Sequence, residues 1–256
     1  MKTAIVLSFD DGRGDNYRAA QEVLIPLEIP ATFNITTDYV EGLASNCHPC
    51  ENQPMSREQV VALSKVPLFE IAGHGKQHRN EQENLIAGVE ELREWCGTYC
   101  SGIASPNSAL PFAQVEHDRM FYGQHGVHYV RLGSRGRSFA RKVADRCNRF
   151  LNSDAVAAYV WKESLIKDTD VFVLPSVPIL HHTTLREVMT LVKAAIKAKQ
   201  SLILMFHSIC KPGEPYYDHM WSWDYNRFTE LCKKLQMLAY EEKIVLRKTA
   251  ELLKKG

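Results

Sequence analysis

Short apolar segments alternate with amphipathic segments along the whole chain, and this alternation limits the fold more than any other feature. The apolar segments are rich in β-branched and aromatic residues, as in 4–9 and 31–36, which favours strands. The intervening segments have apolar residues at helical spacing, and Ser56 with Gln59 forms a capping-box pattern at the start of one of them. Strands separated by helices indicate a parallel sheet with helices on its outside.

The pattern predicts seven or eight β–α units in a single domain over 1–256. Strands are expected at 4–9, 31–36, 68–72, 102–104, 127–131, 171–174, 201–206 and 244–246. Helices are expected at 17–27, 56–66, 81–95, 115–122, 184–199 and 225–241, with a mainly helical stretch over 139–167 and a last short helix. Such an α/β chain is long enough to close its strands into a barrel, and a doubly wound open sheet is the alternative.

The charge and the chain start restrict the partners and the compartment. The net charge is +1, from 31 basic and 30 acidic residues, so no overall field attracts nucleic acid or a membrane. The first apolar run ends in two carboxylates and is too short for a signal peptide. No stretch approaches the roughly 20 apolar residues of a membrane span. We therefore expect a cytoplasmic protein without an integral membrane segment; the sequence does not indicate an oligomeric state.

Seven cysteines, an odd number, argue against a disulfide framework in a chain of this length. Cys47 and Cys50 have C-x-x-C spacing. They could form a redox pair, or half of a structural zinc site with Cys96 and Cys100. C-x-x-C spacing is common, so a loop with two reduced thiols is the favoured interpretation.

Polar residues that can act in catalysis or bind a metal follow three of the predicted strands. Asp10 and Asp11 follow the first strand, His74 and His78 the third, and His207 the apolar strand near the C-terminus. The carboxyl ends of parallel strands form the active site of such folds. These five residues are therefore expected to meet at one rim of the sheet.

Each of these motifs has an ordinary explanation when it is taken alone. An Asp-Asp-Gly after a strand can be a turn or helix cap, and each histidine can be a structural residue. Together, one carboxylate and two imidazoles make a three-ligand site with open positions, which is typical of a catalytic metal. Two histidines four residues apart share a face if they lie on a helical turn. The other aspartate is then available as general base and His207 as general acid.

The same motifs resemble those of the polysaccharide deacetylase family, also called NodB-homology or carbohydrate esterase family 4. The resemblance rests on four segments in order, at 8–12, 31–35, 70–78 and 204–207. It implies a distorted (β/α) barrel with seven or eight mostly parallel strands. It also implies the roles: Asp10 as base, Asp11, His74 and His78 as ligands of a divalent metal, and His207 as acid. Zinc is the favoured metal, with cobalt, nickel, iron and manganese as alternatives.

The sequence departs from the family pattern at three places. Gly75 stands where a Ser or Thr usually follows the first histidine. The third motif has no arginine and reads Ile-Ala-Ser-Pro-Asn, with Pro106 as its proline; Arg131, at the end of the next strand, could orient the base instead. No Asp-and-Trp motif is evident for the acetyl pocket. Trp221 and Trp223 could stack on a sugar ring, or they could be ordinary lid or core residues.

The resemblance and the expected compartment point to an N-acetylated amino sugar as substrate. A nucleotide-linked, lipid-linked or free sugar in surface polysaccharide or lipopolysaccharide biosynthesis fits a protein without an export signal. Two alternatives remain. One is an amidohydrolase that acts on a non-sugar cyclic amide, and the other is a sugar-binding pseudoenzyme on the same scaffold.

Overall fold

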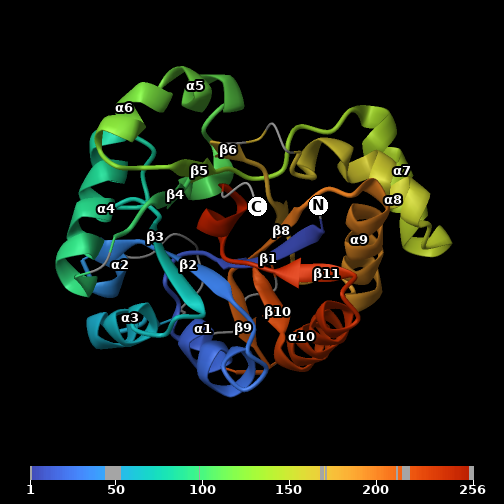
Figure 1. Cartoon of the computed structure of the whole chain (residues 1–256), viewed down its shortest axis with the longest axis horizontal. Helices are drawn as coiled ribbons and strands as arrows, with labels where there is room; N and C mark the ends of the chain where they lie inside the picture. Colours follow the sequence, from blue (N-terminus) through green and yellow to red (C-terminus); the bar gives the residue numbers. More distant parts are fainter. Residues whose placement is uncertain are drawn as a thin grey trace.

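A curved parallel sheet is the centre of the molecule (Figure 1). The computed structural model describes residues 2–43, 53–97, 99–167, 170, 172–211, 213–214 and 220–253. Within these ranges the strands of the sheet are β1 (Thr3–Phe9), β2 (Ala31–Ile35), β3 (Phe69–Gly73), β4 (Gly102–Ala104), β5 (Tyr129–Arg131), β6 (Val173–Leu174), β7 (Val177–Pro178), β8 (Leu202–Phe206) and β11 (Ile244–Leu246). Their order is β6-β5-β4-β3-β2-β1-β8-β7, and β11 pairs with β1 outside this path.

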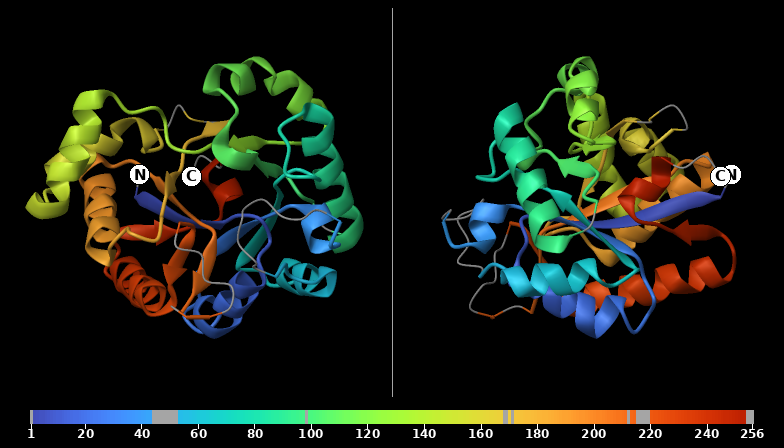
Figure 2. Two further views of the ribbon diagram at one scale, coloured as in Figure 1. Left: turned by 180° about the vertical axis from the view of Figure 1, so that it is seen from behind. Right: turned by 60° about the vertical axis from the view of Figure 1, so that its left-hand side comes forward.

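The predicted distorted barrel is confirmed. Every strand pair found in the described part of this sheet is parallel. The sheet curls so that helices cover its outer side, which two further views show (Figure 2). The two ends of the order, β6 and β7, are not paired with each other among the described residues, so the barrel is open on that side.

Most predicted helices are present, with shifts of one or two residues. The helices are α1 (Gly14–Ala19), α2 (Thr37–Val40), α3 (Arg57–Ser64), α4 (Gln82–Cys96), α5 (Phe112–His117), α6 (Arg119–Gln124), α7 (Phe139–Leu151), α8 (Asp154–Trp161), α9 (Leu185–Ala198) and α10 (Tyr225–Tyr240). Four shorter turns are η1 (Ala20–Leu24), η2 (Pro106–Ser108), η3 (Lys162–Ser164) and η4 (Thr249–Leu253). The predicted capping box of Ser56 and Gln59 starts α3, and Thr184 with Glu187 forms another before α9.

Some predicted elements differ in detail. The helix expected over 17–27 begins at Gly14 and continues as a π-helical turn. The helix expected over 115–122 is two short helices, α5 and α6, because the chain leaves helical geometry at Asp118. A small two-stranded sheet of β9 (Ser208–Cys210) and β10 (Ser222–Asp224) was not predicted. Both segments are short and mix polar with apolar residues, so no apolar run marks them as strands.

The strand β1 holds the centre of the core. All seven of its residues are buried, and it pairs with β8 on one side and with β2 and β11 on the other. Phe9 stacks on Phe33 of β2 and Phe206 of β8, with ring centroids 5.1 and 5.5 Å apart. The three strands therefore end at a packed aromatic layer, which fixes the position of the polar residues that follow them. Among the helices of the described ranges, none combines the length and apolar character needed to cross a bilayer.

Candidate functional site

The predicted site residues converge at the carboxyl ends of the strands. Asp10 and Asp11 follow β1, His74 follows β3, and His207 follows β8. One ligand atom from each of Asp11, His74 and His78 lies within 4.8 Å of the others. Asp11 and His74 are almost completely buried. Asp11 and the two histidines, which come from two distant parts of the chain, thus form one compact donor set.

The geometry of this donor set suits one cation. Asp11 Oδ1 lies 3.4 Å from His74 Nε2 and 3.7 Å from His78 Nε2. Two ligand atoms at about 2.1 Å from a tetrahedral ion lie roughly 3.4 Å apart. Asp11 Oδ1 is buried and has no hydrogen-bond partner among the described residues. A buried carboxylate oxygen without a donor is costly, and a metal ion would remove that cost.

Hydrogen bonding sets the tautomer of His74. Its Nδ1 lies 2.9 Å from the carbonyl oxygen of Ala104. A carbonyl only accepts hydrogen bonds, so Nδ1 carries the proton and Nε2 presents its lone pair toward Asp11. This is the tautomer that a metal ligand needs, and β4 supplies the orienting carbonyl.

Arg13 holds the other oxygen of Asp11. Its Nε and Nη2 both lie 2.8 Å from Asp11 Oδ2, and its Nη1 donates to Ser208 Oγ at 2.8 Å. The arginine is only 1% exposed. Burial alone would raise the pKa of Asp11, but Arg13 and then His74 hold it well below its usual value. Asp11 therefore stays ionised with Oδ1 directed to the two histidines.

Asp10 has a separate set of partners. Arg131, at the end of β5, forms a buried ion pair with Asp10 Oδ1, and Asn34 of β2 donates to the same oxygen at 2.8 Å. Burial would raise the pKa of Asp10, whereas Arg131, with smaller contributions from His74 and His207, keeps it below its usual value. The arginine that the third motif lacks thus has a counterpart on the neighbouring strand. Arg131 faces the aspartate and is 1% exposed.

The two histidines of the donor set lie in a loop. The expectation that they share a helical turn is wrong, because 74–80 forms no helix and Gly75 and His78 have positive φ angles of 74° and 55°. A Cβ at residue 75 would come within 3.0 Å of Arg79 O and Asn84 Oδ1. Glycine at this position has a steric reason, since only glycine adopts such a backbone without strain.

Asn84 of α4 fixes this histidine loop. Its side-chain oxygen accepts hydrogen bonds from the backbone N–H groups of Gln77 and Arg79, at 3.2 and 3.3 Å. Its backbone carbonyl accepts from Lys76 N at 2.9 Å. The helix α4 therefore fixes the backbone of the loop between the two histidines.

A cavity of about 220 Å³ opens beside the donor set. Its lining residues are Asp10, His74, Ser105, Asn107, Ser108, Gly133, Ser134, Pro178, Met205, His207 and Trp221. His207 and Trp221 pack together with ring centroids 4.4 Å apart. The backbone carbonyl of His207 accepts a hydrogen bond from Asn16 at 2.6 Å. The predicted base and acid therefore face one cavity next to the possible metal site.

The structure changes the predicted substrate contacts of two residues, Trp223 and Pro106. Trp223 is fully buried, packs on Phe206 with centroids 5.6 Å apart, and donates from Nε1 to Thr183 O at 2.7 Å. The expected sugar contact at Trp223 is therefore wrong, because the ring belongs to the core. Pro106 is buried beside the cavity, while its neighbours Ser105 and Asn107 line it.

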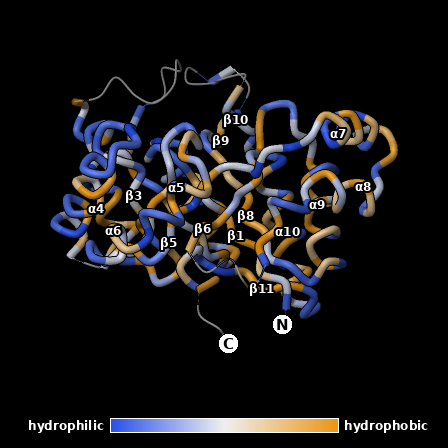
Figure 3. The backbone as a smooth tube through the Cα atoms, turned by 90° about the horizontal axis from the view of Figure 1, so that it is seen from above, coloured by the Kyte–Doolittle hydropathy of each residue, from blue (hydrophilic) through white to orange (hydrophobic). Residues whose placement is uncertain are grey.

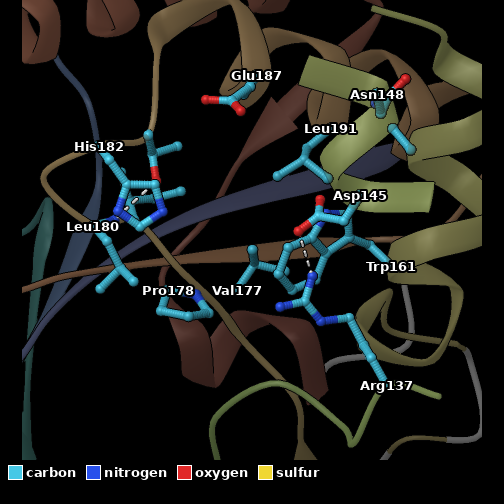
Figure 4. A pocket seen from close by; sticks show the side chains of 13 residues that line it. Arg137, Asp145, Asn148, Trp161, Val177, Pro178, Leu180, His182, Glu187 and Leu191 are labelled. Atoms are coloured by element: carbon cyan, nitrogen blue, oxygen red, sulfur yellow. Dashed lines mark hydrogen bonds and ion pairs between the residues drawn. The ribbon is translucent and has the colours of Figure 1, made fainter. Parts of the chain in front are cut away.

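A second cavity, of about 270 Å³, adjoins the first (Figure 4). Pro178 lines both cavities. The second cavity lies between α7, α8, β7 and α9, and none of the predicted site residues lines it. Arg137 lies over the ring of Trp161 at 4.2 Å and pairs with Asp145 at 2.8 Å.

The cysteine prediction falls mostly outside the described ranges. Cys47 and Cys50 lie outside the described residues. Cys96 is partly exposed and Cys100 is buried, both as free thiols. Burial raises the pKa of Cys100 to about 12, so without a metal its thiol is protonated at neutral pH.

Sequence reasoning missed Arg13, Asn34 and Asn84. Arg13 is two residues beyond Asp11, so its proximity could have been noticed, but no periodic pattern indicates that it turns back onto the carboxylate. Asn34 lies inside an apolar strand, and an amide at a buried strand position is a usable signal because it needs partners. Asn84 looks like an ordinary helix residue in the sequence.

The comparisons with known proteins are structural. No family model matches the sequence, and no curated protein is significantly similar to it. The chain resembles a provisionally assigned polysaccharide deacetylase from Mycobacterium smegmatis, with a TM-score of 0.59 and 11% identity over 98% of this chain and 89% of that one. It also resembles a pseudoenzyme of the CE4 family from Bacillus anthracis, with a TM-score of 0.51 and 11% identity over 99% of this chain and 66% of that one.

A third comparison is partial. The deacetylase domain of BpsB from Bordetella bronchiseptica aligns with 17% identity and a TM-score of 0.42, over 51% of this chain and 64% of that domain. The alignment thus covers less than two thirds of that structure. The fold assignment rests on the two structures with TM-scores above 0.5: the chain has the fold of the polysaccharide deacetylases.

Proposed function

We propose that this chain, folded as the polysaccharide deacetylases are, is a metal-dependent hydrolase that removes the N-acetyl group of an amino sugar. The observation that carries the proposal is the pairing of two separate aspartate environments at one cavity. Asp11 lies with His74 and His78 as a donor set for one cation. Asp10 is held apart from that set by Arg131. Base and ligand are thus distinguished by their partners.

The residues of this chain divide the chemical work. A divalent ion held by Asp11, His74 and His78 would supply Lewis acidity toward the acetamide carbonyl and lower the pKa of a water molecule. Asp10 accepts the proton of the attacking water as its oxygen adds to the carbonyl carbon. Arg131 and Asn34 keep the Asp10 carboxylate ionised and oriented for this step.

His207 completes the reaction on the leaving side. It lines the same cavity as Asp10, so it can give a proton to the nitrogen as the C–N bond breaks. The products are acetate and the free amine. Trp221 packs on the His207 ring, limits its rotation, and offers an aromatic surface to a sugar ring at the cavity wall.

Zinc is our first choice for the cation. Two imidazoles and one carboxylate with open positions are a known catalytic zinc set. Cobalt, nickel, iron and manganese accept the same donors. The substrate that we favour is a nucleotide-linked, lipid-linked or free N-acetylated amino sugar of surface polysaccharide or lipopolysaccharide biosynthesis, deacetylated in the cytoplasm.

The test compares two neighbouring carboxylates. Purified protein is incubated with Zn²⁺ and N-acetylglucosamine derivatives, and released acetate is measured. Asp10→Asn should lower turnover by about 10²–10⁴-fold and still bind zinc, whereas Asp11→Asn should lose both zinc and activity. Loss of zinc in Asp10→Asn would contradict the role assignment. No acetate from any acetylated sugar, with zinc bound, would contradict the deacetylase.

Two other functions would give different results in the same assay. A cyclic amide hydrolase would open an amide ring with zinc bound and release no acetate. A sugar-binding pseudoenzyme would bind the acetylated sugar without turnover. The Bacillus anthracis structure of the same fold is described as a pseudoenzyme, which is why the binding measurement belongs beside the acetate assay. The intact pair of Asp10 and Arg131 supports catalysis.

A further inference from the structure

The helix α7 presents its apolar side to the outside of the molecule. Phe139, Val143, Phe150 and Leu151 are 83%, 42%, 87% and 66% exposed. Positions 139, 143 and 150 fall on one face of an α-helix, because they are separated by four and seven residues. No described side chain of α7 is buried. An apolar face on a surface helix normally packs against the core, and this one does not.

The polar side of α7 faces the protein instead. Asp145 pairs with Arg137 at 2.8 Å, and Asp145 and Asn148 line the second cavity (Figure 4). Arg141 pairs with Glu163 at 3.3 Å. Ser138 caps the first turn by accepting a hydrogen bond from Arg141 N. These contacts orient the helix, so the outward direction of the apolar face is built into the fold.

A basic edge borders the apolar face. Lys142 and Arg146 are four residues apart and exposed, and neither side chain forms a hydrogen bond or ion pair with another described residue. They flank Phe139 and Val143 on the helix surface. A basic edge beside exposed Phe and Leu is typical of helices that lie in a membrane interface.

We propose that α7 is a docking surface for an anionic lipid bilayer. Phe139, Val143 and Phe150 enter the interface, and Lys142 and Arg146 contact lipid phosphates. Figure 3 shows α7 toward the end of the molecule that carries β9 and β10, opposite the N-terminus. Because β9 directly follows His207, docking brings the cavity end of the barrel near the bilayer. A symmetric contact between two copies would bring two basic edges together, which anionic lipid does not.

The test uses the whole chain and vesicles of defined composition. Wild type should sediment with vesicles of phosphatidylglycerol and phosphatidylcholine, and bind pure phosphatidylcholine about tenfold or more weakly. The double variant Phe139→Ser with Phe150→Ser should lose binding by about tenfold or more. Lys142→Glu with Arg146→Glu should lose the preference for anionic vesicles. The matched control is Met120→Ser with Tyr240→Ser, at residues 78% and 88% exposed, which should bind as wild type does.

Several results would overturn the proposal. One is no binding of wild type to anionic vesicles; another is equal loss in the control variant. A third is a dimer in light scattering that Phe139→Ser with Phe150→Ser dissociates, without vesicle binding; it would assign the face to a second copy. Circular dichroism verifies that each variant is folded. Substitutions at these exposed positions should leave the fold unchanged. The outcome is independent of the proposed deacetylation.

Discussion

The barrel buries carboxyl groups at both of its ends, and their pKa values shift in opposite directions. At the carboxyl ends of the strands, Asp10 and Asp11 each face an arginine, Arg131 and Arg13. At the opposite end, the described partners of Glu70, near the start of β3, are neutral donors and a more distant lysine. Burial raises the pKa at all three residues, but only the arginines reverse its direction. The direction of the pKa shift therefore depends on the charge of the partner and not on how deeply the carboxyl group is buried.

The Glu70 end uses its carboxyl as a structural junction. Glu70 accepts from Thr32 Oγ1 and Tyr129 OH, each at 2.9 Å, and from Ala250 N at 3.0 Å. These contacts connect β2, β3, β5 and the C-terminal turn η4. The Tyr129 ring fits because residue 102 is glycine: a Cβ there would lie 2.0 Å from the ring. One barrel thus contains a buried carboxyl group held by hydrogen bonds and two buried carboxylates paired with arginines.

Removing the guanidinium group that pairs with Asp10 should have the largest effect on stability and activity. In Arg131→Met, Asp10 is buried without its ion-pair partner, so its pKa should rise and stability should fall by about 3–5 kcal/mol. Acetate release at neutral pH should drop about 10²–10⁴-fold, with the alkaline side of the pH profile partly restored. Arg137→Met, which breaks the partly exposed pair with Asp145, is the control. An unchanged pH profile in Arg131→Met would mean that Arg131 does not set the charge of Asp10.

Arg13 should matter for the metal rather than for the base. Arg13→Met removes both hydrogen bonds to Asp11 Oδ2 and leaves the carboxylate free to rotate. Zinc affinity should fall about 10–100-fold, the usual cost of losing such a supporting contact. Isothermal titration of the apoprotein with Zn²⁺ measures this. Equal affinities for Arg13→Met and wild type would show that the histidines alone position the ion.

The smallest effect is expected at Glu70. Its pKa is raised rather than lowered, so its contribution to stability depends on pH in the opposite direction to that of Asp10 and Asp11. The folded pKa is raised, so between the unfolded and folded pKa values only the folded state keeps the proton. This contribution is present at low pH and is lost as pH rises through the folded pKa. Glu70→Gln should flatten that decline, by on the order of 1 kcal/mol between pH 5 and pH 8. Urea unfolding at both pH values measures it, with Glu163→Gln as control; a decline that persists in Glu70→Gln would place its source elsewhere.

Local sequence was enough for most of the elements and for their order along the chain. The apolar runs of β1, β2 and β8 and the capping boxes before α3 and α9 are determined by neighbouring residues, and the structure confirms them. The alternation of strands and helices then leaves few topologies, because parallel strands need crossover helices. From this order alone, Asp11, His74 and His78 could be expected at one rim of the sheet.

Only the tertiary structure decided which way the site side chains point and which partners they meet. The sequence cannot show that Arg13 turns back to Asp11 or that Arg131 reaches Asp10 across the sheet. It also cannot distinguish Trp221 at the cavity from Trp223 in the core. Hydrophobic periodicity specifies which side of an element is apolar. Whether that side meets the core or the solvent, and which charges meet, depends on contacts between residues far apart in the chain.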